Sequence, residues 1–366
     1  MRLLRLELRH HLGARSSLQR HGGSTQCARG TAMRDGGSGD PHRAQRQERI
    51  GLLCAAYCAL NGAFVPAFAK LTTNAAAPLS VAAITTLCAG LSAAVVLWMR
   101  AELRLLTRGP AAGWLLAVGS LGTAIAFLLF FWGARQASAI DTVLCLQSEP
   151  AYSLLLTWLV LGHRPTRRRL GAITFLLSGI ALAVGAHGFD VSIGIWLLLA
   201  TPLCWQLSHL IVLRRLVGLP PSVLTGARYI DGGVILSFLW LTSGGMTALP
   251  PPAAFLRVLP LLVFQGVVLS YLGTLVWYQA ITRLDLARTT AIVVPSIPLL
   301  SLAASFLLLG EVPSPTQCIG LVLTATGVFA FVTAPHVGTG FQTVASPASA
   351  VLEATASAAD SLRPAQ

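Results

Sequence analysis

The sequence predicts an all-α membrane protein with ten transmembrane helices, built as two inverted five-helix repeats. The first observation is the composition, because 54% of the 366 residues are hydrophobic and 11% are charged, whereas soluble domains carry roughly 25% charged residues. The second is a series of apolar runs close to the roughly 20 residues that a helix needs to cross the hydrocarbon layer. The third is an internal repeat, because several residues of the earlier apolar runs recur at corresponding positions of the later ones.

The two ends of the chain are polar and lie outside the predicted spans. Residues 1–49 are rich in Arg, Gly and Ser and contain no apolar stretch of the kind found in secretory signal peptides. We favour a disordered basic tail, or an over-long gene model over residues 1–32 with Met33 as the true start, above an Arg-rich transit segment. Residues 335–366 are rich in Ala, Ser and Thr, and we predict a second disordered tail.

Ten apolar runs lie between these tails, five in each predicted repeat. The repeats are residues 50–186 and 192–334. The predicted spans are residues 50–71, 80–99, 112–133, 140–161, 169–186, 192–213, 222–242, 256–281, 289–309 and 316–334.

The arginines in the connections predict the orientation. With ten spans, one end of the bundle receives Arg100, Arg104, Arg108, Arg164, Arg167, Arg168, Arg169, Arg214, Arg215, Arg283 and Arg288, while the other receives Arg135 and Arg257. Because basic loops stay on the cytoplasmic side, we expect a multi-pass protein of the cell (inner) membrane with both termini cytoplasmic. A missed or extra span would scramble this bias.

The net charge of +13 does not indicate a nucleic-acid partner, because the arginines lie in a tail and in loops between apolar runs. The seven cysteines are scattered mostly within apolar runs, which is not a disulfide framework. Cys54 and Cys58 share a helix face but lack the further ligands that zinc requires. We therefore expect no metal site and no cofactor.

An internal repeat connects the two halves of the chain. At an offset of 148 residues, the run from Ser148 to Pro165 meets identical residues at Ser, Pro, Leu and Gly positions in the run from Ser296 to Pro313. Each half holds five spans, and five is an odd number, so the second half must enter the bilayer from the opposite side. Inverted repeats of this kind are typical of secondary transporters, whose substrate site lies between the halves near the membrane midplane.

These landmarks are similar to those of the ten-helix, two-domain EamA-type members of the drug/metabolite transporter superfamily. The resemblance covers about residues 50–334 and rests chiefly on Glu149-Pro150 with a leucine run ending at Gly162, and on Pro298 with Leu309-Gly310-Glu311. It implies a proton-coupled or facilitated carrier for small metabolites, often an exporter.

The halves differ in where they carry charge. The first has Glu149 before its proline, and the second has Ile297 at the corresponding place. Members of the resembled family often carry an arginine seven residues after the proline of their second helix. Here Thr85 holds that position in the first half and Arg228 in the second. One half therefore supplies a carboxylate and the other an arginine.

Glu149 is the main candidate functional residue. A charge inside a membrane span is rare and usually functional, and a buried carboxylate can bind and release a proton near neutral pH. We predict that Glu149 couples proton movement to substrate movement. The structural alternative is that it secures the backbone freed by Pro150, or that it lies near the membrane interface.

Other polar residues of the spans are candidate substrate contacts. Arg228 and Asp231 share a helix face, so they either pair with each other or face substrate, and Arg228 could bind an anionic group through two nitrogens. Lys70 either anchors at the interface or contacts the cavity. The remaining candidates, for which packing or helix–helix hydrogen bonding is the alternative, are Asn61, Gln147, Trp205, Gln206 and Tyr278.

Three prolines predict discontinuous helices beside the central site. Pro150 lies in the fourth span, and Pro295 and Pro298 lie in the ninth. Discontinuous backbone in a membrane is tolerated beside protein or a water-lined cavity. The alternative is that these prolines produce simple kinks.

The sequence therefore predicts a secondary active transporter, proton-coupled and exporting, for small metabolites such as amino acids or drug-like compounds. It contains no ATP-binding loop and no zinc or nucleophile motif of an enzyme, so we assign no catalytic residue. The alternatives are a passive receptor or scaffold of the same fold, and a nucleotide-sugar or lipid carrier of the same superfamily. The expected partners are the bilayer, a small-molecule substrate and protons, and homodimerisation stays open.

Overall fold

The computed structural model describes residues 41–107, 109–162, 164–185, 192–284 and 286–334, and these ranges contain helices and no strand. The two predicted tails lie mostly outside the described residues. The one difference is at their inner edge, since residues 41–49, which we expected in the N-terminal tail, form the start of the first long helix.

The helices follow the predicted order. The first repeat contains α2 (Pro41–Ala75), α3 (Pro78–Met99), the short α4 (Arg104–Thr107), α5 (Ala111–Gly119), the π-helical segment η1 (Ser120–Ile125), α6 (Ala126–Gln136), α7 (Ala139–Leu146), α8 (Glu149–Leu161) and α9 (Arg167–Gly185). The second contains α10 (Ile193–Arg215), α11 (Pro221–Thr242), α12 (Pro252–Phe264), the π-helical segment η2 (Gln265–Leu272), α13 (Gly273–Leu284), α14 (Leu286–Leu309) and α15 (Pro315–Thr333).

Some spans consist of more than one segment. The third is α5–η1–α6, the fourth is α7–α8, and the eighth is α12–η2–α13. Among the described residues, 9 spans are long and apolar enough to cross a membrane. The predicted span that is not among these 9 is the seventh, α11, which has 22 residues and is less apolar because Arg228 and Asp231 interrupt it. The all-helical, two-repeat prediction is confirmed, with one span that length and composition alone would not select.

Local sequence explains where the repeated helices end. The left-handed backbone conformation that glycine adopts at low cost ends a helix. Gly162 has φ +74° directly after α8, and Gly310 has φ +67° directly after α14. The repeated Leu-Gly pair is therefore a helix stop, used once in each half.

Close contacts between α3 and α11 show the two-fold relation of the halves. A Cβ added to Gly90 would lie 2.7 Å from the carbonyl oxygen of Tyr229, and one added to Gly233 would lie 3.2 Å from that of Thr86. Gly233 follows Gly90 by 143 residues, and Tyr229 follows Thr86 by the same number. Each contact is therefore repeated with the partners exchanged, as a two-fold axis requires.

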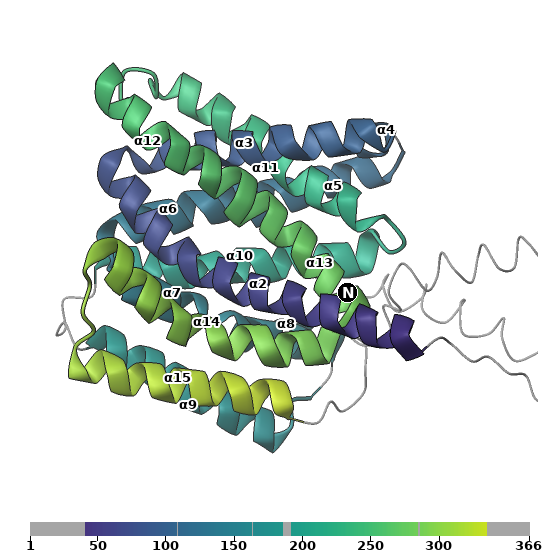
Figure 1. Cartoon of the computed structure of the whole chain (residues 1–366), viewed down its shortest axis with the longest axis vertical. Helices are drawn as coiled ribbons and strands as arrows, with labels where there is room; N and C mark the ends of the chain where they lie inside the picture. The colour runs from purple at the N-terminus through teal and green to yellow at the C-terminus, as the bar shows by residue number, and fades with distance from the viewer. Residues whose placement is uncertain (1–40, 108, 163, 186–191, 285, 335–366) are drawn as a thin grey trace, which may run out of the picture. The chain divides into compact units, whose positions relative to one another are not determined.

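A second pair of equivalent helices, α9 and α15, lies side by side (Figure 1). Gly179 faces the backbone of Gly320, and Gly327 faces the backbone of Ala172. Gly327 follows Gly179 by 148 residues, and Gly320 follows Ala172 by the same number. The contact is therefore again repeated with the partners exchanged. Small residues let membrane helices approach closely, so glycines hold the two halves together at both places.

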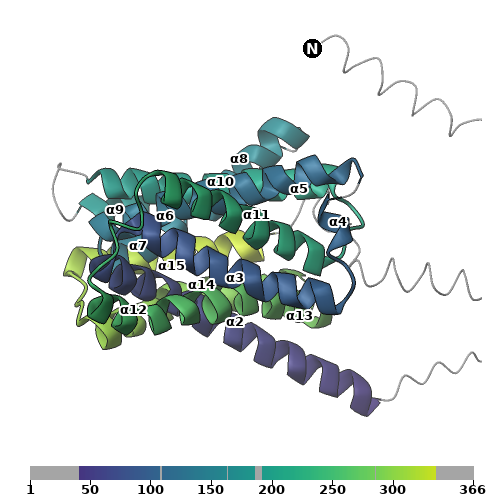
Figure 2. The same cartoon turned by 90° about the horizontal axis from the view of Figure 1, so that it is seen from above.

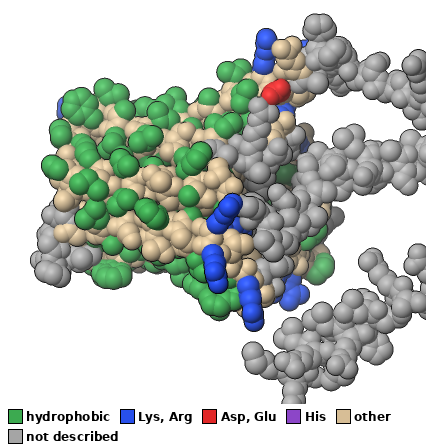
Figure 3. All heavy atoms as spheres, turned by 90° about the horizontal axis from the view of Figure 1, so that it is seen from below, with side chains coloured by type: hydrophobic (Ala, Val, Ile, Leu, Met, Phe, Trp, Pro, Cys, Tyr) green, Lys and Arg blue, Asp and Glu red, His purple; other side chains and the backbone are tan. Residues whose placement is uncertain are grey.

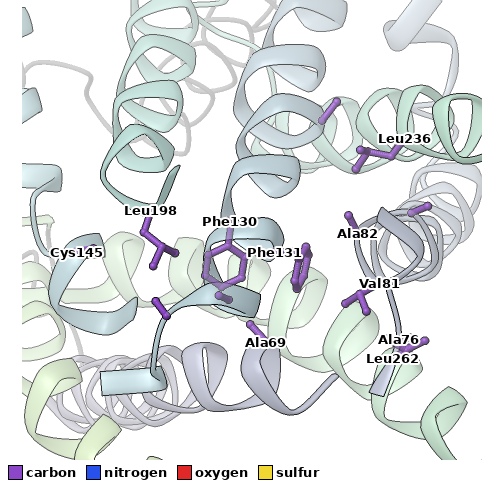
Figure 4. Packing of buried hydrophobic residues seen from close by; sticks show 14 of the residues in the cluster. Ala69, Ala76, Val81, Ala82, Phe130, Phe131, Cys145, Leu198, Leu236 and Leu262 are labelled. Carbon is purple, nitrogen blue, oxygen red and sulfur yellow. The ribbon is translucent and has the colours of Figure 1, made fainter. Parts of the chain in front are cut away.

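The largest buried cluster joins α2, α3, α6, α10, α11 and α12 (Figure 4). Phe130 and Phe131 of α6 fill its centre, and small residues such as Ala69 and Ala82 surround them. Leu198 of α10 and Leu236 of α11 bring side chains of the second repeat into the same cluster. The core is therefore shared between the repeats.

The molecular surface separates apolar and basic side chains. Many large apolar side chains are exposed along the spans, among them Trp98, Phe238 and Leu307. In Figure 3 most of the visible Lys and Arg side chains gather toward one end of the face shown. We call the end with the connections after α3, α8, α10 and α13 the Arg-rich end, and the end with the connections after α2, α6, α11 and α14 the Arg-poor end.

Candidate functional site

The candidate site starts at the division of the fourth span. α7 ends at Leu146 and α8 begins at Glu149. Pro150 has no N–H to donate to the carbonyl of Leu146, which favours a break at this point. The hydroxyl of Ser148 donates to the carbonyl of Cys145 at 2.7 Å and occupies one carbonyl of the break. Glu149 is thereby placed at the start of a helix inside the membrane span.

Glu149 makes a side-chain contact with the other repeat. Its Oε1 accepts a hydrogen bond of 2.6 Å from Nε2 of Gln206 in α10. Gln206 is buried, whereas Glu149 is partly exposed. A carboxylate whose hydrogen-bond partner is a neutral amide can remain ionised or take up a proton.

Arg228 provides positive charge beside this carboxylate. Its guanidinium acts electrostatically on both Glu149 and His209, and its Nη2 donates to the carbonyl of Gly122 in η1 at 3.1 Å. Its Nε has no partner among the described residues, and the same is true of Nε1 of Trp205. The described part of the site therefore offers unused hydrogen-bond donors as well as one carboxylate.

Asp231 lies near Arg228 in sequence but does not pair with it. No ion pair or hydrogen bond joins these two described side chains, and the Cβ of Asp231 faces Gly119 at the end of α5. The sequence left open whether Arg228 and Asp231 pair with each other or face substrate. The structure does not contain a salt bridge between them.

The ninth span differs from expectation at its prolines. We expected Pro295 and Pro298 to break this helix, but α14 runs through both without interruption. The side chain of Gln147 explains part of this, because its Nε2 donates to the carbonyl of Val294 at 3.3 Å. The residue that would donate to this carbonyl within the helix is Pro298, which has no N–H.

Asn61 forms a helix–helix hydrogen bond. Its Nδ2 donates to the carbonyl of Leu269 in η2 at 2.9 Å, and Tyr57, one turn earlier, donates to the carbonyl of Val268 at 3.4 Å. π-Helical turns expose backbone carbonyls and often occur at functional sites. η1 and η2 lie at equivalent places in the two repeats, and side chains of neighbouring spans bind carbonyls in both.

Lys70 belongs to a different polar cluster, at the Arg-poor end. Its Nζ donates to the carbonyl of Arg135 at 3.0 Å, and it interacts electrostatically with Glu311 and Asp141. Arg135 in turn donates to the carbonyl of Thr73. The structure therefore separates Lys70 from Glu149, although the sequence suggested both as candidates.

The centre of this second cluster is the start of α7. Both carboxylate oxygens of Glu311 accept from the backbone N–H of Ala139, at 3.2 and 3.0 Å, and one also accepts from Ile140 at 3.4 Å. Ser138 caps the same helix by accepting from the N–H of Asp141 at 2.9 Å. Oδ1 of Asp141 accepts from Nε2 of Gln317 at 2.9 Å.

Two patterns in the sequence point to this cluster. Ser138 followed three residues later by Asp141 is a helix-start pattern, and Glu311 belongs to the repeated Leu-Gly motif. The partnership between Glu311 and α7 could not be inferred, because 172 residues separate Glu311 from Ala139.

The side chain of Tyr278 lies outside the described residues. In the described ranges, no group of three or more His, Cys, Asp or Glu side chains is arranged to hold a metal ion. The six cysteines within those ranges are free.

Divided spans, inverted repeats and opposite charges within the spans are typical of a polytopic membrane transporter. The profile of the EamA-like transporter family matches the chain twice, at residues 49–185 and 192–333, and the chain belongs to that family. It is thus a multi-pass membrane protein that transports small molecules.

Individual relatives agree with this assignment. A probable terminal-alkyne amino-acid exporter of Streptantibioticus cattleyicolor is 28% identical over 214 residues, which are 57% of this chain and 69% of the exporter. The uncharacterized transporter YyaM of Bacillus subtilis is 25% identical over 208 residues, 55% of this chain and 66% of YyaM. One crystal structure, 18% identical, superimposes with a TM-score of 0.54 over 79% of this chain and 97% of its own, which shows the shared fold alone.

Proposed function

We propose that this protein is a proton-coupled exporter of small zwitterionic metabolites, of which amino acids are the simplest class. The observation that carries the proposal is the hydrogen bond from Gln206 to Glu149 at the division of the fourth span, with the guanidinium of Arg228 acting on the same carboxylate. This pair of opposite charges lies in the membrane-spanning region, where an ionisable group is costly to keep without a function.

The two charges match the two ends of a zwitterion. A guanidinium binds a carboxylate through a fork of N–H donors, and the unpartnered Nε of Arg228 is available for this. Glu149 would then bind the ammonium group of the same substrate. The amino-acid exporter among the relatives supports this substrate class.

Competition at Glu149 would supply the coupling. A carboxylate binds a proton or an ammonium group but not both, so protonation of Glu149 releases the substrate and loss of the proton allows it to bind. With more protons outside than inside, each proton that enters would displace one substrate molecule outward. The same competition gives a proton-for-substrate exchange without any further cofactor.

The orientation follows from the basic connections. The Arg-rich end is the cytoplasmic end by the positive-inside rule, which places both ends of the helical region in the cytoplasm of a cell-membrane protein. Glu149 then takes up its substrate from the Arg-rich end and releases it at the Arg-poor end.

The test is transport by the purified full-length protein in liposomes that contain a pH-sensitive dye. A panel of amino acids is supplied on one side, with and without an imposed pH gradient. We expect the wild-type protein to move protons against substrate, and Glu149→Gln to lose at least tenfold of the gradient-driven flux, since a neutral amide cannot carry a proton.

The matched control is Glu102→Gln. Glu102 lies near the Arg-rich end, where it accepts a hydrogen bond of 2.5 Å from Ser222, so this variant also loses one carboxylate but not the one at the site. Undiminished proton coupling in Glu149→Gln would contradict the proposed role of Glu149. A wild-type transport rate that is the same with and without the pH gradient would indicate a facilitated carrier.

A further inference from the structure

The two halves of the fourth span are packed differently. All residues of α7 from Ala139 to Cys145 are buried, whereas Leu154 is the one buried side chain among the described side chains of α8. Both segments pack against α10, but α7 also packs against α14, α15, α9 and α6, whereas the extensive contact of α8 is with α10 alone. Figure 2 shows α8 standing away from the other helices. The half of the span at the Arg-poor end is thus buried, and the described side chains of the half at the Arg-rich end, Leu154 aside, are half-buried or exposed.

Glu311 is the link that crosses between the repeats at the Arg-poor end. It follows Gly310, whose φ of +67° ends α14, and its carboxylate accepts from the N–H groups of Ala139 and Ile140 at the start of α7. A negative charge at a helix N-terminus is stabilised by the helix dipole and by the unpaired N–H groups. Gln317 of α15 adds a second link through Asp141.

The equivalent sequence positions at the Arg-rich end carry different side chains. At the 148-residue offset, Glu311 corresponds to His163, Ser138 to Leu286 and Asp141 to Thr289. A leucine offers no acceptor to a helix start, and a threonine offers no carboxylate. The two carboxylates that bind at the Arg-poor end therefore have no carboxylate at the equivalent sequence positions of the Arg-rich end.

We infer that Glu311 is a latch, a positioning residue that keeps the Arg-poor end closed while the Arg-rich end is open. For Glu149 to reach the Arg-poor side, α7 must separate from α14 and α15, and this separation breaks the bonds between Glu311 and the start of α7. The latch sets the balance between the two open states. The inference rests on the proposed function for its role in transport, but the state of the latch can be measured without any substrate.

The test uses a cysteine at the interface that the latch covers. Val143 of α7 is buried in a cluster with residues of α14 and α15, and Val143→Cys changes its volume little. In the full chain, with the seven native cysteines replaced, a membrane-impermeant maleimide is added to vesicles from the Arg-poor side. Labelling then reports how often this end opens.

We expect Glu311→Gln and Glu311→Ala to raise the labelling rate from the Arg-poor side by roughly five- to thirtyfold, the range that loss of a charged helix cap predicts. The rate from the Arg-rich side should stay the same or fall. Glu102→Gln, which removes a carboxylate at the opposite end, should change neither. An unfolded variant would be labelled faster from both sides, which separates unfolding from unlatching.

Equal labelling of the parent, Glu311→Gln and Glu311→Ala from the Arg-poor side would overturn the latch. Adding Glu149→Gln should leave the rise intact, because closure does not depend on the coupling carboxylate. If labelling rises as expected while no proton coupling is found in liposomes, the latch stands and the proposed coupling fails. If coupling is found without the rise, the reverse holds.

Discussion

Gln147, at the division of the fourth span, donates a 3.3 Å hydrogen bond from its Nε2 to the carbonyl of Val294 in the ninth span. Pro298 leaves that carbonyl without its helical N–H partner. A side chain of one repeat thus completes the backbone hydrogen bonding of the other at Pro298, one of the two prolines through which α14 passes without ending. An unsatisfied carbonyl at membrane depth is costly, so the two spans depend on each other.

This relationship predicts coupling between Gln147 and Pro298. Gln147→Leu should lower the free energy of unfolding by about 1–2 kcal/mol, since it strands the carbonyl of Val294. Pro298→Ala restores an N–H at position 298, so in the double variant the same Gln147→Leu change should cost clearly less. The measurement is a double-mutant cycle on thermal unfolding of the purified protein in detergent.

The control for this cycle is Gln265→Leu. Gln265 accepts a hydrogen bond from Thr72 at 3.1 Å and has no relation to a proline-freed carbonyl. Its effect should add to that of Pro298→Ala without interaction. Strict additivity of Gln147→Leu with Pro298→Ala would show that the bond to Val294 does not compensate for the proline.

The close approach of α3 and α11 predicts a difference between two helical glycines. Gly90→Ala places a Cβ 2.7 Å from the carbonyl oxygen of Tyr229, whereas a Cβ at Gly113 meets nothing within 4 Å. Gly90→Ala should destabilise the fold by about 1–3 kcal/mol through overpacking. Gly113→Ala should be neutral or slightly stabilising, because alanine favours the helix. Melting temperatures of the two variants, measured side by side, decide between these outcomes.

Much of the fold could be predicted because membrane constraints act on the sequence directly. Apolar runs near 20 residues give the spans, arginine placement supports their number, and the recurring Leu-Gly stop reveals the repeat. The π-helical segments η1 and η2 could not be predicted, since no residue pattern distinguishes them from ordinary α-helix. The continuity of α14 through Pro295 and Pro298 also escaped prediction, because the carbonyl freed by Pro298 is bound by Gln147 from the other repeat.

Some residues of the candidate site could also be selected from the sequence, because charged residues are rare within membrane spans. Glu149 and Arg228 could be singled out as charges within apolar runs, and the asymmetry between the halves suggested that they act together. What one sequence did not reveal was the set of partners, such as Gln206 for Glu149 and α7 for Glu311. These partnerships arise where the repeats meet, and sequence periodicity carries no information about contacts between distant segments.

We expect Arg228 to bind the carboxylate of the substrate, and this binding depends on the planar geometry of the guanidinium. Arg228→Lys keeps the positive charge but loses the planar fork of donors. We expect the concentration needed for half-maximal transport of an amino acid to rise by roughly 10- to 100-fold. The methyl ester of the same amino acid, which has no carboxylate, should be affected much less.

Arg215→Lys provides the matched comparison for Arg228→Lys. Arg215 lies at the end of α10, where its guanidinium is 4.9 Å from the ring centroid of Trp114, away from Glu149. Liposome assays of this variant should give nearly wild-type concentrations for half-maximal transport. An equal loss for the amino acid and its ester in Arg228→Lys would show that Arg228 supports the fold or the field of the site without binding the carboxylate.

Asp231 tests whether proximity in sequence is enough to create a functional pair. Its side chain faces Gly119, and no ion pair joins it to Arg228 among the described residues, so Asp231→Asn removes a charge on which Arg228 does not depend. We expect half-maximal transport concentrations within about threefold of wild type and intact proton coupling. The liposome assay that tests Glu149→Gln measures both quantities. A loss of coupling as large as that of Glu149→Gln would instead assign Asp231 to the proton path, because an isosteric amide differs from aspartate in charge and proton binding but hardly in shape.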